Sequence, residues 1–259
     1  MRFNENPYGP SPGAQKAAAE ATALGAYYAT DMPGILTNTI ADKNQLAADN
    51  VVLSSGSNEA LQAAFVAWGK KGRVVMPGLT YTDHVGYSRR MGVELDLVPL
   101  KKDMSIDLDR IADAVDDSIS LVYICNPNNP TGMTLDGDEL RDFCRTVGKK
   151  AVVIVDEAYN DGMAGMRVGY GLARPDLAST IKNHLMAWSN VVGLAAANGI
   201  EPLPSQTNFV YADISRNASE FQKQMAARNV LNPNYSRISM GRIEDIRVFQ
   251  QVFSDVYRG

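Results

Sequence analysis

Two short polar runs, each at the end of an apolar stretch, contain residue types that could do chemistry together. The first is Asn126-Pro127-Asn128-Asn129-Pro130-Thr131-Gly132, and the second is Asp156-Glu157-Ala158-Tyr159, which follows Val153-Ile154-Val155. Their spacing suits a strand, a crossover helix and the next parallel strand, so we expect both runs at one edge of a sheet. They would bring an amide, a carboxylate and a phenol to that edge. Such groups suit a cofactor with an aromatic nitrogen ring.

The elements that must position these groups alternate between strands and helices. Strands are predicted at 51–54, 73–76, 93–98, 119–125, 151–155 and 167–170. Helices are predicted at 11–24, 82–91, 107–115 and 135–147. A further helix is predicted to start near Ser57, with Ser57 or Asn58 as its N-cap. This alternation predicts an α/β fold with three layers, in which helices flank a mostly parallel sheet. Residues 151–155 are all apolar and residues 119–125 are apolar apart from Ser120, as parallel strands covered on both faces should be.

The order of predicted strands and helices changes after about residue 200. Strands at 208–212 and 237–240 and helices at 216–228 and 243–257 predict a small α+β unit. We therefore divide the chain into an N-terminal arm with part of the small domain (1–25), a large cofactor-binding domain (26–197) and a small C-terminal domain (198–259).

The composition excludes several classes of protein. The net charge of −4 and the pI of about 5.3 are atypical of a nucleic-acid-binding protein. Cys125 and Cys144 have no metal-ligand spacing, so no metal site is predicted. No stretch of 18 apolar residues predicts a membrane span, and Met1-Arg2-Phe3-Asn4 does not begin a signal peptide. These features predict a cytoplasmic protein, although a trimmed leader stays open.

The two polar runs resemble those of fold-type I pyridoxal-phosphate (PLP) aminotransferases of class I/II, especially histidinol-phosphate aminotransferases. The resemblance implies PLP as cofactor, an amino acid and a keto acid as small-molecule partners, and a homodimer. It implies that Asp156 pairs with the protonated ring nitrogen, and that Asn129 and Tyr159 reach the O3′ oxygen. These three are the predicted catalytic residues. Taken alone, Asp156 is better explained as an exposed loop aspartate or a helix cap, and the asparagine run could be a proline-fixed turn. The two motifs together favour the functional interpretation.

Further parts of the chain resemble the family's binding segments. The residues that the resemblance places around the cofactor are Gly56, Ser57 and Asn58 at a phosphate-cradling turn, Tyr81 stacked on the ring, Arg167 on the phosphate and Tyr28 reaching the neighbouring subunit's phosphate. Those that it places around the substrate are Asn6, Tyr8, Asn208 and Arg237, of which Arg237 would hold the α-carboxylate. A helix start offers free N–H groups to an anion, and a guanidinium binds a carboxylate through two hydrogen bonds. Each residue alone could equally be a helix cap or a loop, core or surface side chain.

One residue of the family pattern is absent. The family has a Ser-Lys pair shortly before the arginine that corresponds to Arg167, and its lysine forms the Schiff base. This chain has no lysine between Lys150 and Lys182. The segment between 156 and 167 is also short for a crossover between adjacent parallel strands. Either strand 167–170 is antiparallel, or residues are omitted near 161/162; similar omissions are predicted near 197/198 and 231/232. PLP could then be unbound in a structure of this chain.

The sequence leaves three functions open. The first is transamination between an L-amino acid, or an amino-alcohol phosphate, and a 2-oxo acid. The second is decarboxylation or oxidation on the same cofactor, and the third is a non-catalytic ligand-binding relative without the lysine. Histidinol phosphate as substrate is not fixed, because the additional phosphate-binding arginine of the family has no counterpart in Leu231-Asn232-Pro233-Asn234-Tyr235.

Overall fold

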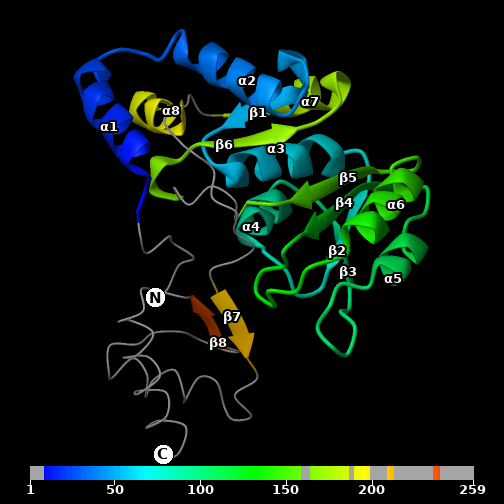
Figure 1. Ribbon diagram of the computed structural model, residues 1–259. Helices are drawn as coiled ribbons and strands as arrows, with labels where there is room; N and C mark the ends of the chain where they lie inside the picture. The colour runs from blue at the N-terminus through cyan, green and yellow to red at the C-terminus, as the bar shows by residue number, and fades with distance from the viewer. Residues whose placement is uncertain (1–8, 159–163, 187–189, 199–208, 213–235, 240–259) are drawn as a thin grey trace, which may run out of the picture.

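The computed structural model describes residues 9–158, 164–186, 190–198, 209–212 and 236–239 (Figure 1). The helices are α1 (Pro12–Ala21), α2 (Met32–Lys43), α3 (Ser57–Gly69), α4 (Asp83–Arg90), α5 (Leu108–Asp113), α6 (Gly137–Val147), α7 (Pro175–Lys182) and α8 (Val191–Asn198). The strands are β1 (Val51–Ser54), β2 (Arg73–Pro77), β3 (Leu95–Val98), β4 (Ile119–Cys125), β5 (Val152–Asp156), β6 (Gly169–Leu172), β7 (Phe209–Ala212) and β8 (Ser236–Ser239). Most predicted strands and helices are therefore confirmed, with ends that differ by a few residues.

Four parallel strands form the sheet that carries the two polar runs. Its order is β3-β2-β4-β5, and every neighbouring pair is parallel. Cys125 at the end of β4 lies opposite Asp156 at the end of β5. The asparagine run and the aspartate thus leave the sheet at the same edge, as their spacing predicts.

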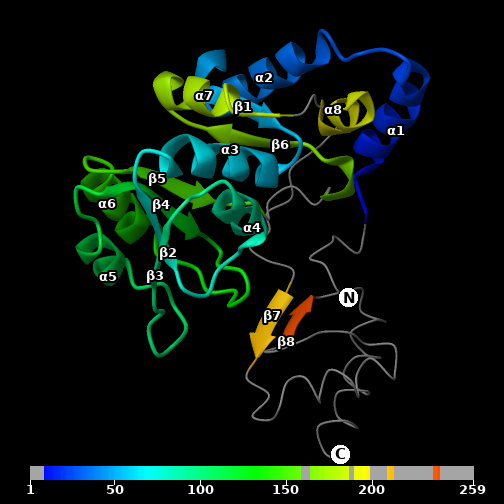
Figure 2. The same ribbon diagram turned by 180° about the vertical axis from the view of Figure 1, so that it is seen from behind.

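Helices cover both faces of this sheet, which gives the predicted three layers (Figure 2). One face packs against α5 and α6, and its buried side chains include Val122, Ile111 and Phe143. The other packs against α3 and α4, and its buried side chains include Phe65 and Tyr123. Because side chains alternate along a strand, odd and even positions of β4 and β5 face opposite layers.

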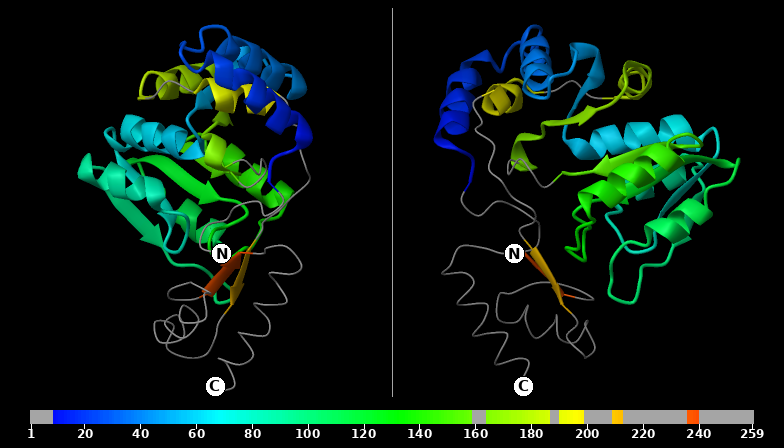
Figure 3. Two further views of the ribbon diagram at one scale, coloured as in Figure 1. Left: turned by 90° about the vertical axis from the view of Figure 1, so that its left-hand side faces the viewer. Right: turned by 45° about the vertical axis from the view of Figure 1, so that its right-hand side comes forward.

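A separate two-stranded sheet lies beside this layered unit. β1 pairs antiparallel with β6, so that Ser54 lies opposite Gly169. Helix α3 contacts both of these strands as well as β2 and β4, and so connects the two sheets (Figure 3). β6 is not paired with β5, so the chain between them does not need to make the crossover that adjacent parallel strands require.

β5 departs from the prediction that it is covered on both faces. All seven residues of β4 except Ser120 are buried, whereas Val152 to Val155 are half-buried. The reason is position, because β5 has only one neighbour among the described strands and forms the edge of its sheet.

The predicted small domain is described only in part. β7 and β8 form an antiparallel pair in which Tyr211 lies opposite Arg237. The helices expected at 216–228 and 243–257 lie outside the described residues, as do two places of suspected omission, near 161/162 and 231/232. The third, 197/198, falls within α8, where the helix runs through both residues. The domain boundaries therefore stay a prediction.

Candidate active site

Asp156 is the buried carboxylate at the centre of the candidate site. It ends β5, and its side chain is only 6% exposed. Val152 and Ile154 face the same side of the sheet as Asp156, because every second residue of a strand does. Both pack against the layer formed by α3 and α4. Tyr81, which follows β2, packs against the same layer. Asp156 and Tyr81 therefore lie on one face of the sheet and at one edge, which the assignment to a cofactor site requires.

Two hydrogen bonds hold the Asp156 carboxylate. The Tyr123 hydroxyl donates to Oδ2 at 2.8 Å, and the Ala158 backbone N–H donates to Oδ1 at 3.2 Å. Burial raises the pKa of Asp156, and both hydrogen bonds act against this shift. No lysine, arginine or histidine in the described ranges forms an ion pair with this carboxylate. A buried carboxylate in this setting favours a cationic ligand.

The asparagine run forms a rigid loop beside Asp156. Asn128 is fully buried, and its side chain bonds to Thr80 at 2.8 Å, to the Leu79 carbonyl at 3.1 Å and to Thr131 at 3.0 Å. Its amide is therefore used in holding the loop together. Asn129 is also buried, and its backbone N–H lies against the Cys125 thiol. Of the two neighbouring asparagines, Asn128 holds the loop together, and Asn129 is the one that the resemblance predicts as a donor to a ligand.

An aromatic cluster links Tyr81 to the strand that positions Asp156. His84 on α4 is fully buried, 5.7 Å from the Tyr81 ring and 4.8 Å from the Tyr123 ring, measured between centroids. The Phe65 ring from α3 lies 4.5 Å from His84. Burial lowers the pKa of His84 to about 4, so the imidazole is neutral at neutral pH. His84 therefore supplies no positive charge to Asp156.

The turn before α3 has the geometry of an anion site. Gly56 has φ +86° and ψ 156°, a conformation that is nearly restricted to glycine. The prediction that Ser57 or Asn58 caps the helix is wrong, because the N-cap is Gly56 and no side chain caps it. The N-cap residue of α3 therefore has no side chain that accepts a hydrogen bond from the backbone N–H groups of the first turn. Backbone N–H groups at a helix start can donate to a phosphate.

Arg167 lies directly against this turn. Its Nη2 donates to the Ser55 carbonyl at 3.2 Å, and a Cβ added at Gly56 would lie 2.6 Å from the same nitrogen. Arg167 also has φ +53°, which is uncommon for a residue with a side chain and is found at functional sites. The Asn58 Oδ1 atom is buried without a hydrogen-bond partner in the described part of the molecule. The predicted phosphate-binding residues Gly56, Ser57, Asn58 and Arg167 are thus adjacent.

The other predicted site residues have different outcomes. Asn6, Tyr8, Tyr159 and Asn208 lie outside the described residues, and of Arg237 only the backbone in β8 is described. Tyr28 is 80% exposed beside α2, so it is accessible to a second subunit. Their roles stay predictions.

Sequence reasoning missed Tyr123 and His84. Tyr123 is the fifth residue of an apolar strand, and its parity matches that of Cys125, which pairs with Asp156. This parity is the signal that could have indicated a polar tip facing the carboxylate. His84 lies on the first turn of α4, and Tyr81 immediately precedes the N-cap Thr82, so the closeness of the two in the sequence is the signal that could have indicated their contact.

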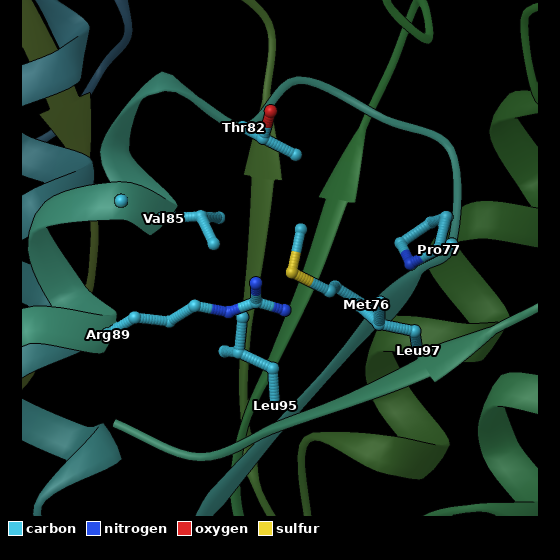
Figure 4. A pocket seen from close by; sticks show the side chains of 9 residues that line it. Met76, Pro77, Thr82, Val85, Arg89, Leu95 and Leu97 are labelled. Carbon is cyan, nitrogen blue, oxygen red and sulfur yellow. The ribbon is translucent and has the colours of Figure 1, made fainter. Parts of the chain in front are cut away.

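A hollow on the β3 side of this edge is distinct from the site. Apolar residues of β2, β3 and α4 line it, and the Arg89 side chain lies over Leu95 (Figure 4). Thr82 borders it, but none of the predicted site residues does. In the described part of the chain, no group of histidine, cysteine or acidic residues could hold a metal ion, and no helix is long and apolar enough to cross a bilayer.

No lysine is placed to bind a cofactor covalently in the parts of the chain that are described. Lys149 and Lys150 precede β5 and lie at its other end, and Lys182 is exposed on α7. The residues therefore fit PLP in part. They include a buried carboxylate, an aromatic side chain on the same face and a helix start beside an arginine, but the described residues offer no group for covalent attachment.

Comparisons with known proteins agree with this arrangement. The sequence model of the family described as "Aminotransferase class I and II" matches residues 1–186 of this chain. The chain is 29% identical over 318 residues to a histidinol-phosphate aminotransferase of Symbiobacterium thermophilum, covering 96% of this chain and 88% of the relative. It is also similar to the structure of a candidate histidinol-phosphate aminotransferase of Erwinia carotovora atroseptica (25% identity, TM-score 0.89, 100% and 96% of the two chains). The fold of the Sinorhizobium meliloti histidinol-phosphate aminotransferase in complex with PLP is similar too (22% identity, TM-score 0.81, 100% and 90% of the two chains).

The chain therefore belongs to the class I and II aminotransferase family. The predictions of the fold, of a PLP-dependent aminotransferase and of PLP as cofactor are confirmed. The match of 318 residues is longer than the 259-residue chain, so the relative contains residues that have no counterpart here.

Proposed function

We propose that this chain binds PLP at Asp156, Tyr81, Asn129 and the turn formed by Gly56 and Arg167, and that it transfers an amino group to a 2-oxo acid. The observation that carries this proposal is the buried Asp156 carboxylate, which has no cationic partner among the residues described. PLP, when bound, supplies an electron-withdrawing ring that weakens the bonds at the substrate's α-carbon. A charged Asp156 keeps the ring nitrogen protonated, which this chemistry requires.

The remaining residues hold and orient the cofactor and the substrate. Arg167 and the first N–H groups of α3 complement the phosphate dianion. Asn129 donates to the ring oxygen, and Tyr81 covers one face. Arg237 binds the substrate carboxylate, and Tyr28 contributes from a second subunit of a cytoplasmic homodimer. The names of the relatives support histidinol phosphate or a related amino-alcohol phosphate as amino donor.

A second function is favoured by one observation, the absence of a lysine between Lys150 and Lys182. Without that amine, the chain would hold PLP non-covalently and act as a ligand-binding relative. Borohydride reduction of the PLP complex, followed by mass spectrometry, distinguishes the two. A mass increase on a single lysine supports the enzyme, and an unmodified chain with bound PLP supports the binding protein.

The proposal is tested by titrating the protein with PLP and following its absorbance. Asp156→Asn should weaken PLP binding at least tenfold, because a charge-assisted hydrogen bond contributes about 1.5–3 kcal/mol. Asp117→Asn is the matched control, because Asp117 is an exposed carboxylate at the opposite end of the sheet, before β4. Equal PLP affinity of Asp156→Asn and wild type would refute the assignment. A screen of amino donors, histidinol phosphate included, with detection of the keto product then identifies the substrate.

A further inference from the structure

A tyrosine inside the sheet holds the carboxylate of the candidate site. Tyr123 is fully buried in β4, where burial raises the pKa of its phenol well above the ordinary value. The phenol therefore stays protonated, and its hydroxyl is a donor to the Asp156 Oδ2 atom at 2.8 Å. A donor of this kind stabilises the charged form of a carboxylate over the neutral form.

The phenol ring is itself fixed in place. It stands 5.6 Å from the Phe65 ring at an interplanar angle of 71°, and 4.8 Å from the His84 ring. Both neighbours are fully buried, and they come from α3 and α4. Because side chains from two helices pack against the ring, the hydroxyl has a defined position from which to orient Asp156.

We propose that Tyr123 is the positioning residue for Asp156, which it holds charged and in one orientation for the ring nitrogen of PLP. This inference rests on the proposed function, because it assumes that Asp156 faces the cofactor. Ala158 donates the second hydrogen bond, but through its backbone N–H, so only Tyr123 supplies a side chain that can be changed.

Tyr123→Phe removes the hydroxyl and retains the ring. Among the described residues, the buried Oδ2 atom then has lost its hydrogen-bond donor, so the pKa of Asp156 rises further. We expect PLP affinity at pH 7 to fall about tenfold or more, and the acid limb of the PLP-binding curve to move up by about one pH unit or more. Tyr87→Phe is the matched control, since Tyr87 is on α4 and its hydroxyl donates to the exposed Met186 sulfur at 3.5 Å rather than to a site residue.

Three other groups face this carboxylate or its phenol partner. Burial raises the pKa of Cys125 to about 12 and lowers that of His84 to about 4, so neither changes charge near neutral pH. The pKa of Glu157 is raised by burial and by Asp156. The pH curves are therefore measured in a Glu157→Gln background as well, where the shift caused by Tyr123→Phe should persist.

A double-mutant cycle separates positioning from packing. If Tyr123 acts through Asp156, adding Tyr123→Phe to Asp156→Asn should change PLP affinity by less than about twofold. The same loss in both backgrounds, or an unchanged affinity and pH curve in the single variant, overturns the inference. If Asp156→Asn alone binds PLP like the wild type, the proposed function fails instead. Equal thermal midpoints of Tyr123→Phe and Tyr87→Phe show that the fold is retained. If Tyr123→Phe unfolds, Phe65→Leu is the second variant. It removes a ring that packs against Tyr123, and it should weaken PLP binding although Asp156 itself is unchanged.

Discussion

Gly56 provides a direct test of the phosphate turn, because one added methyl group would act on both the backbone and Arg167. With φ +86° and ψ 156°, the residue occupies a region that costs a residue with a Cβ about 1–3 kcal/mol. The added Cβ would also lie 2.6 Å from Nη2 and 2.9 Å from Cζ of Arg167. These separations are too short, so the guanidinium must move away from the Ser55 carbonyl that it now contacts.

Gly56→Ala should therefore have two separable effects. The strain should lower the melting temperature by about 2–12 °C. Displacement of the guanidinium should weaken PLP binding by about 10–100-fold, because a hydrogen bond to a charged group contributes about 1.5–3 kcal/mol. Differential scanning fluorimetry measures the first effect, and titration with PLP and with inorganic phosphate measures the second.

Gly92→Ala is the matched control. Gly92 has a similar φ of +82°, but a Cβ there would have no atom within 4 Å. This variant should lose stability from backbone strain and retain PLP affinity. If Gly56→Ala binds PLP and phosphate as tightly as Gly92→Ala does, then Arg167 and the turn before α3 do not hold the phosphate.

Two further predictions concern packing and pH. Gly169→Ala should cost at least about 2–3 kcal/mol of the free energy of unfolding, because its Cβ would overlap the backbone of Ser57 and Gly56; Gly171→Ala, whose Cβ would only touch Val52, should change it by less than about 1 kcal/mol. Both are measured by urea denaturation, and equal losses would refute the close approach of β6 to α3. His84 has a folded pKa of about 4 against 6.5 unfolded, so the unfolded chain takes up the proton first and stability falls as pH drops from about 6.5 to 4, by up to about 3 kcal/mol. His84→Phe should remove this loss between pH 7 and pH 4.5, and an unchanged pH dependence would contradict it.

The strands and the two polar runs could be predicted from the sequence because each depends on local pattern. A short, mostly apolar run rich in β-branched and aromatic residues, such as 119–125, is typical of a buried parallel strand, and the residue that follows it leaves at the sheet edge. This reasoning predicts Asp156 at the sheet edge, whereas Tyr81 is predicted from the family resemblance alone; the structure has both on one face.

Features that depend on contacts between distant elements could not be predicted in this way. The hydroxyl of Tyr123 meets Asp156 only because β4 and β5 are paired in register. The N-cap of α3 is a glycine because Arg167, more than a hundred residues away, occupies the space that a side chain would fill. The half-buried β5 follows from strand order, which periodicity does not contain.

The anchors of the candidate site belong to different sheets, and this has a physical consequence. Asp156 ends β5 of the four-stranded sheet, whereas Gly56 follows β1 and Arg167 precedes β6 in the two-stranded sheet. α3 is the element that contacts both sheets, since its N-cap is Gly56 and its Phe65 belongs to the aromatic cluster beside Tyr123. A ligand that binds Asp156 through its ring and Arg167 through its phosphate would join the two sheets directly. Its binding free energy would then add to the stability of the fold, because such a ligand binds the assembled sheets and not the unfolded chain.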